Sequence, residues 1–263
     1  MIRFITVLFC LLFVCEAHAE PVALKMRNAS ASVQLNAALN DANYWAEATR
    51  YDYRKQLYDE IRLKTVGDGH MTMITGEGEQ DYPHEIVADT VFLHQDQLQS
   101  HMEGCKRVLE LGSGIDPVNG LPYMDVFYYM DLTAFYTSFT QRMYQITDDS
   151  GRSIMFFEKI DSSFVDAQTW SEYQRKIDAV SATVDRRSIF GALVPIEDVF
   201  GMFIVEPGDN HESRVTLIAK LYFGDEAGWI AQVGSKIPIV LKEGLQSGFD
   251  ACVSISRSEK ARL

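Results

Sequence analysis

Cysteine is scarce in this sequence, with four residues in 263, and two of them, Cys10 and Cys15, lie in an apolar stretch at the N-terminus. The other two, Cys105 and Cys252, stand far apart in sequence and belong to no CxxC or Cys/His cluster. Their spacing excludes a zinc site and a framework of several disulfides. Two separate buried thiols are the simpler expectation, and a Cys105–Cys252 disulfide, which an oxidising compartment would permit, is the alternative.

The sequence also lacks the short motifs of common enzymes, including GxSxG, HExxH and the P-loop. Residues 108–116, VLELGSGID, resemble the first motif of Rossmann-type S-adenosylmethionine methyltransferases, but Pro117, Gly120 and Pro122 follow where that motif requires a helix. We therefore predict a tight turn between strands there. No catalytic residue, metal ligand or cofactor is expected, so binding is favoured over catalysis.

Long apolar runs are missing after the N-terminus, and the run found there, Ile5 to Val14, is shorter than the roughly 20 residues of a membrane-spanning helix. Arg3 precedes it, and Ala17-His18-Ala19 follows it as a small-x-small cleavage site. We predict that residues 1–19 are a signal peptide cleaved after Ala19. The expected location is periplasmic or secreted.

Acidic residues outnumber basic ones, which gives a formal net charge of −13. This charge excludes nucleic acid as a partner and repels anionic membrane surfaces at long range. It is compatible with transient membrane contact and with lipids bound singly inside a cavity. A hydrophobic content of 47% and only 7 prolines are typical of a folded domain with a sizeable core. The oligomeric state is left open.

Hydrophobic periodicity predicts an α+β fold. Residues 20–66 are expected to hold a loose lead-in followed by a helix over 43–64. Short helices are expected over 94–105 and 167–180. Strands are expected over residues 84–92, 106–111, 123–132, 135–146, 153–160, 187–194, 201–205 and 215–223. Because short loops join these strands, we predict an antiparallel meander.

The C-terminal region predicts a long amphipathic helix over residues 228–256, broken or kinked at Pro238. The text of residues 215–245 resembles START-type lipid-transfer domains and their polyketide-cyclase-like relatives, through Gly228-Trp229-Ile230 and Lys236-Ile237-Pro238. Residues 84–111 are similar to the opening elements of the same family. The resemblance implies a helix-grip fold over residues 67–263, in which a curved antiparallel sheet wraps around the C-terminal helix.

Aromatic and methionine side chains are unusually frequent in the predicted strands, and together with a closing helix they are typical of an apolar cavity. The predicted cavity residues are Phe127, Tyr129, Phe139, Arg142, Met143, Phe157, Phe203, Leu217, Val233, Ile237 and Leu241. Arg142, or else Glu158 or Lys159, is the candidate to orient a polar end of the ligand.

We therefore expect an exported protein that holds a lipid or other apolar small molecule between sheet and C-terminal helix, with lipid transfer as one use. Two alternatives remain at this point. One is a hydrolase or cyclase on the same scaffold, which requires a carboxylate or histidine with a displaced pKa in the pocket. The other is an interaction domain without a cavity.

Overall fold

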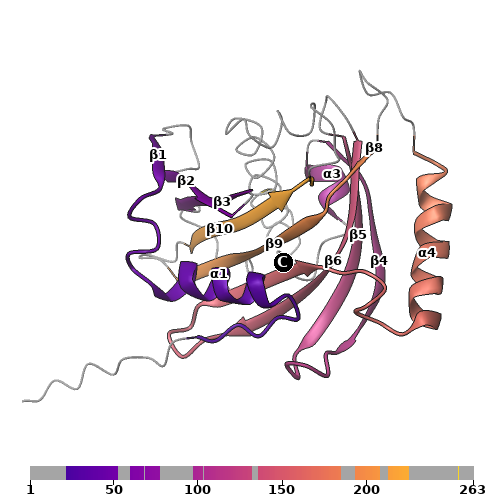
Figure 1. Cartoon of the computed structure of the whole chain (residues 1–263), viewed down its shortest axis with the longest axis horizontal. Helices are drawn as coiled ribbons and strands as arrows, with labels where there is room; N and C mark the ends of the chain where they lie inside the picture. Colours follow the sequence, from indigo (N-terminus) through magenta and orange to yellow (C-terminus); the bar gives the residue numbers. More distant parts are fainter. Residues whose placement is uncertain are drawn as a thin grey trace, which may run out of the picture.

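The computed structural model shows a strongly curved sheet with helices on its sides (Figure 1). It describes residues 22–52, 60–67, 69–77, 97–102, 104–131, 136–184, 193–207, 213–224 and 254. The predicted strand over 84–92 lies outside these residues. So does the predicted helix over 228–256, apart from Ser254, which is helical.

Ten strands of the described residues form one sheet in the order β1-β2-β3-β10-β9-β7-β6-β5-β4. The strands are β1 Thr49–Asp52, β2 Glu60–Val66, β3 Gly69–Glu77, β4 Cys105–Ile115, β5 Pro122–Asp131, β6 Tyr136–Thr147, β7 Ser153–Lys159, β8 Leu193–Pro195, β9 Asp198–Pro207 and β10 Ser213–Tyr222. The helices are α1 Ala29–Asn40, α3 Leu98–His101 and α4 Ala167–Ser181. Neighbours along this order pair antiparallel, as predicted, but the order is a meander only in part, because β3 pairs with β10 and β7 with β9. β8 makes a short parallel pair with β6.

The turn predicted near residue 116 is confirmed, because β4 and β5 form an antiparallel hairpin. The Asp116 N–H donates to the Leu121 carbonyl at 2.8 Å, and Gly120 has a φ of 74°, a left-handed conformation that glycine adopts at low cost. The predicted helix over 167–180 is also confirmed as α4. The Asp166 side chain caps its N-terminus by accepting from the Gln168 and Thr169 N–H groups.

The N-terminal region differs from the prediction at two places. Residues 20–40 do not form a loose lead-in, because α1 occupies Ala29–Asn40 and buries Ala31, Leu35 and Ala38 against the sheet. Because most of its buried residues are small, the sequence of this helix shows no clear hydrophobic pattern. Its first turn is stabilised by Asn28, whose side chain accepts from the Ala31 N–H at 3.0 Å.

The helix predicted over residues 43–64 is wrong, because the segment enters the sheet as β1 and β2. Over β2 the apolar residues Ile61 and Leu63 alternate with Arg62 and Lys64. This alternation is typical of a strand, although some of the same residues also fit a helical spacing. Pairing with β3 across the whole strand decides between the two periods. Tyr44, which the helical pattern included, packs in a turn beside α1.

The two faces of the sheet are covered differently. The outer face carries Tyr144, Phe156 and Phe200 and is covered by α1; near β4 and β5 it is covered by α4, whose Tyr173 is buried there (Figure 1). The inner face carries Met143, Phe157, Leu217 and their neighbours. Within the described part of the chain, no helix is both long and apolar enough to cross a membrane.

Replacing the cap residue tests the docking of α1. We expect Asn28→Ala to lower the free energy of unfolding by about 1 kcal/mol, because the first-turn N–H group of Ala31 loses its acceptor. Ser30→Ala, at an exposed position of the same turn, is the control and should change stability by less than about 0.5 kcal/mol. Urea unfolding followed by circular dichroism measures both. Equal effects of the two substitutions would argue against the cap.

Candidate ligand-binding site

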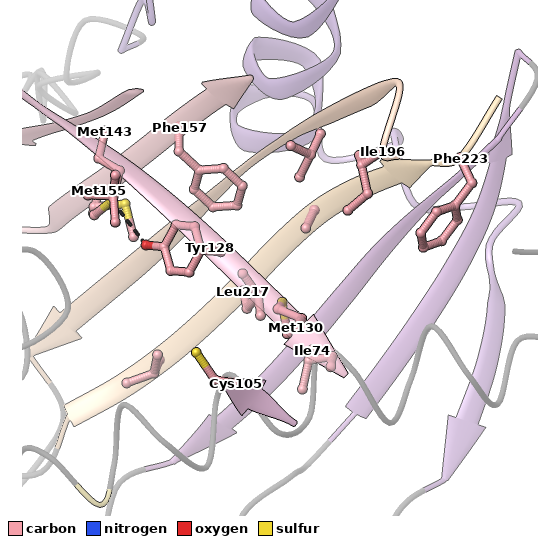
Figure 2. Close-up of a cluster of buried hydrophobic side chains, with 14 of the residues drawn as sticks. Ile74, Cys105, Tyr128, Met130, Met143, Met155, Phe157, Ile196, Leu217 and Phe223 are labelled. Atoms are coloured by element: carbon pink, nitrogen blue, oxygen red, sulfur yellow. Dashed lines mark hydrogen bonds between the residues drawn. The ribbon is translucent and has the colours of Figure 1, made fainter. Parts of the chain in front are cut away.

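The inner face gathers five of the predicted cavity residues from four adjacent strands. Met143, Phe157 and Leu217 belong to its buried cluster (Figure 2), and Phe139 and Phe203 pack against that cluster while remaining partly exposed. The predicted residues Val233, Ile237 and Leu241 lie outside the described residues. The strand alternation of β6, β7, β9 and β10 therefore assembles a continuous apolar surface, as the sequence pattern indicated.

Several large apolar side chains of the inner face are only partly buried. They are Met102, Val108, Met124, Phe139, Phe203 and Leu221. The Phe139 ring stacks on Tyr128 with centroids 5.1 Å apart. At Gly201 a Cβ atom would lie 2.6 Å from the Phe157 ring, so glycine lets that ring lie against the backbone of β9. The inner face thus presents flat aromatic surface that is not fully covered.

Polar groups on the inner face are few and uncharged where they are buried. The Tyr128 hydroxyl lies 3.6 Å from the Met143 sulfur, to which it donates, and accepts from the Gln141 side-chain amide at 3.3 Å. Cys105 carries a free thiol, and burial raises its pKa to about 11, which keeps it protonated at neutral pH. Among the described residues no group of His, Cys, Asp and Glu side chains could hold a metal ion.

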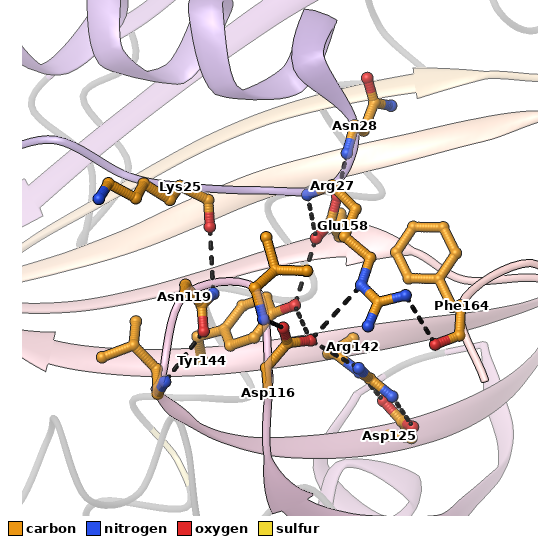
Figure 3. Close-up of polar contacts among 12 residues, drawn as sticks. Lys25, Arg27, Asn28, Asp116, Asn119, Asp125, Arg142, Tyr144, Glu158 and Phe164 are labelled. Atoms are coloured by element: carbon orange, nitrogen blue, oxygen red, sulfur yellow. Dashed lines mark hydrogen bonds and ion pairs between the residues drawn. The ribbon is translucent and has the colours of Figure 1, made fainter. Parts of the chain in front are cut away.

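Charged side chains are instead buried on the outer face, around Arg142 (Figure 3). Its guanidinium contacts both oxygens of Asp125, at 2.7 and 2.8 Å, and one oxygen of Asp116 at 2.6 Å. It also lies over the Tyr123 ring, 3.7 Å from the centroid. Arg142 and both carboxylates are at most 1% exposed. The Tyr173 hydroxyl of α4 donates to Asp125 at 2.9 Å, which ties that helix to the network.

The same network holds the N-terminal segment before α1. Glu158 accepts from the backbone N–H groups of Arg27 and Asn28 at 3.1 and 2.8 Å. The Tyr144 hydroxyl lies between Glu158 and Asp116, at 3.3 and 3.1 Å. Residues 22–28, which we call the N-terminal strap, are therefore joined by partly buried hydrogen bonds to β7, which lies more than 100 positions away in sequence.

Burial acts differently on the two carboxyl groups. At Asp116 burial disfavours the charge, but hydrogen bonds from the Val118 N–H, Arg142 and Tyr144 outweigh it and hold the pKa below its ordinary value. At Glu158 burial dominates and raises the pKa, although the N–H groups of Asn28 and Arg27 oppose it. Arg142 thus helps to keep Asp116 ionised, whereas Glu158 becomes protonated at a higher pH than an ordinary glutamate.

Three predicted cavity residues do not lie on the inner face. Phe127 and Tyr129 point to the α4 side, and Arg142 is held by two carboxylates on the outer face. Arg142 is one residue out of phase with Met143, and a shift of one residue along a strand reverses the face. Of the other candidate anchors, Glu158 is also on the outer face. Lys159 lies on the inner side, opposite Gln141 in the β6–β7 register, and its amine donates to the Glu197 carbonyl.

The sequence reasoning missed Asp116 and Asp125 altogether. A signal was present for Asp125, which interrupts the apolar stretch of β5 and so needs a buried cation. In the structure it stands directly opposite Arg142 in the β5–β6 register. Asp116, in the turn after β4, carried no comparable signal because turn residues are commonly acidic.

Comparison of the whole chain places this arrangement among known folds. The sequence matches no protein-family model and no curated protein. The structure is similar to human STARD10, at a TM-score of 0.56 and 10% identity over 91% of this chain and 85% of that one. It is also similar to human StAR-related lipid transfer protein 5, at 0.53 and 8% identity over 85% and 93%.

A bacterial structure agrees: the STAR-related lipid transfer protein fragment from Xanthomonas axonopodis matches at a TM-score of 0.53 and 8% identity, over 80% of this chain and 98% of that one. The chain has the START fold. This confirms the helix-grip α+β class that residues 215–245 and 84–111 predicted. At such low identity the likeness establishes the fold. A function can be proposed only from the side chains of the inner face.

Removing the buried cation tests the outer network. We expect Arg142→Met to lower the free energy of unfolding by about 3–5 kcal/mol, because two buried carboxylates lose their counter-charge. The control is Arg152→Met, which breaks a pair with Asp148 whose arginine is 28% exposed and should cost at most about 1 kcal/mol. Urea titration measures both. Similar losses for the two variants would show that the network stabilises little.

The raised pKa of Glu158 predicts a pH-dependent difference. Because the native state takes up this proton more readily than the unfolded chain, the protonated form adds stability at low pH, and that stability is lost as pH rises through the native pKa. We therefore expect wild type to gain stability relative to Glu158→Gln as pH falls from about 7 to 4. Thermal unfolding at several pH values measures this. A difference that is constant with pH would contradict it.

Proposed function

We propose that this chain is an exported protein that binds a lipid or other apolar molecule against the inner face of its sheet. The observation that carries the proposal is the partial exposure of Phe139, Phe203 and Met124 in the interior of that face. On the outer face of the same strands, Tyr144, Phe156 and Phe200 are completely buried. The outer face also has partly buried apolar residues, such as Met73 and Ile146, but α1 covers that face (Figure 1), so the inner face is the surface proposed for the ligand.

Burial of apolar surface would supply the binding energy, at about 25 cal/mol for each Å² removed from water. Side chains of β6 and β9 stand in reach of one ligand, because β7 alone separates these strands in the sheet and adjacent strands lie roughly 5 Å apart. Methionines among the aromatic residues adapt to ligands of irregular shape. The likeness to structures named for lipid transfer supports the same ligand class.

Export is supported by the N-terminal sequence, in which Arg3, the apolar run over 5–14 and Ala17-His18-Ala19 follow the order of a signal peptide. The N-terminal strap begins at Val22, close behind the proposed cleavage site, and Leu24 is buried. Mass spectrometry of the protein expressed from its complete sequence tests cleavage. A mature N-terminus at Glu20 supports export, and an intact Met1 in the folded product would contradict it.

Extraction of the purified chain tests the binding function directly. Organic solvent should release a lipid that mass spectrometry identifies, and protein stripped of it should take up lipid from vesicles of mixed composition. Phe139→Ala should weaken this uptake about tenfold, because one aromatic contact of roughly 1.5 kcal/mol is removed. Ile146→Ala, a partly buried residue on the outer face of the same strand, is the matched control and should bind as wild type.

An empty extract together with no uptake by the stripped wild-type chain would overturn the proposed function. Equal loss of uptake in the two variants would mean that the inner face is not the binding surface.

A further inference from the structure

Buried polar side chains of the described sheet and its turns divide by charge between the two faces. On the outer side the charged members are Asp116, Asp125, Arg142 and Glu158. On the inner face the register places Thr72, Thr137, Gln141 and Ser213, all of them uncharged. Within the described residues, the surface proposed to meet the ligand therefore offers buried hydrogen-bonding groups and no buried charge.

Thr137 is the member of this set that lacks a partner. It faces the inner side, since it stands opposite Met130 on β5 and Val194 on β8, both of which belong to the inner cluster. Its side chain is completely buried, and its hydroxyl makes no hydrogen bond to the protein. A buried hydroxyl without a partner is costly, which singles it out as a group that another molecule can satisfy.

Phe139 gives this hydroxyl an accessible neighbour. Along β6 the inner-face residues run Thr137, Phe139, Gln141, with about 7 Å between successive members. Phe139 is partly exposed, whereas the two polar residues beside it are buried. A ligand that covers the Phe139 ring would lie beside both neutral groups, and the side chains that cover them would have to move for it to reach either.

We infer that the ligand is a neutral amphiphile, with an apolar body and an uncharged hydroxyl or carbonyl group, and that the Thr137 hydroxyl binds this group. This inference rests on the proposed function and narrows its ligand class. A charged head group buried on the inner face would need a buried counter-charge there, and Lys159, which the register places on this face, is only partly buried and donates to the Glu197 carbonyl. A neutral hydroxyl needs only a single donor or acceptor, which Thr137 offers.

Two lipids that differ only in charge test the ligand class. Stripped wild-type protein is incubated with phosphatidylcholine vesicles containing equal amounts of dioleoylglycerol and dioleoylphosphatidic acid, and the bound lipids are quantified by mass spectrometry. We expect dioleoylglycerol to be enriched at least tenfold. Preferred uptake of phosphatidic acid or phosphatidylcholine would overturn this inference and leave the proposed function intact, whereas no uptake of any lipid would overturn both.

Substitution of Thr137 tests the residue. Thr137→Val keeps the shape and removes the hydroxyl, so we expect about fivefold weaker binding of dioleoylglycerol, the effect of one hydrogen bond. The unfolding midpoint should be unchanged or raised, because the hydroxyl has no partner in the empty protein.

Thr140→Val makes the same change at a buried position on the outer face of β6 and should bind dioleoylglycerol as wild type does. Wild-type affinity in Thr137→Val would overturn the assignment of this residue. So would an equal loss in the Thr140→Val control.

Discussion

The buried ion network around Arg142 is the interaction on which the rest of the structure depends. It joins the three adjacent strands β5, β6 and β7, the turn after β4, helix α4 and the N-terminal strap through the Arg142 guanidinium, the Tyr144 hydroxyl and the carboxylates of Asp116, Asp125 and Glu158. A buried network of this kind stabilises a fold only when its hydrogen bonds are made, since any missing member leaves a buried charge uncompensated. Elements distant in sequence are therefore held together on the outer face of the sheet.

Placing the charges on the outer face has a consequence for the inner face. A strand alternates its side chains, so each charged residue of β5, β6 and β7 that points outward leaves its neighbours, such as Tyr128, Met143 and Phe157, to point inward. The buried charged groups lie on the outer face, and the inner face is left mostly apolar. The inner face is therefore suited to a ligand that carries little charge, and the outer face is suited to permanent packing.

The sequence predicted the central strands and α4 because their patterns are strong and locally consistent: β10 alternates cleanly, with Val215, Leu217 and Ala219 on one face. Its second face buries Ile218 against the α1 cluster, and nothing in the strand itself reveals that a helix far earlier in the sequence covers it. Helix α1 was missed because its buried residues are mostly alanines. Arg142 was assigned to the ligand because charge suggests function, whereas the face of a strand residue depends on register, which only the assembled sheet defines.

Both faces of the sheet contribute buried residues to the fold, but the partly exposed aromatic surface of the central strands lies on the inner face. Apolar surface left partly open on the inner face, at Phe139 and Phe203, contributes little to folding until something covers it. The fully buried rings and ion pairs of the outer face stabilise the fold without a ligand, together with the buried part of the inner cluster, such as Met143 and Leu217. A ligand bound as proposed would cover these partly exposed side chains while the pairing of the strands and the contacts of the outer face stay in place.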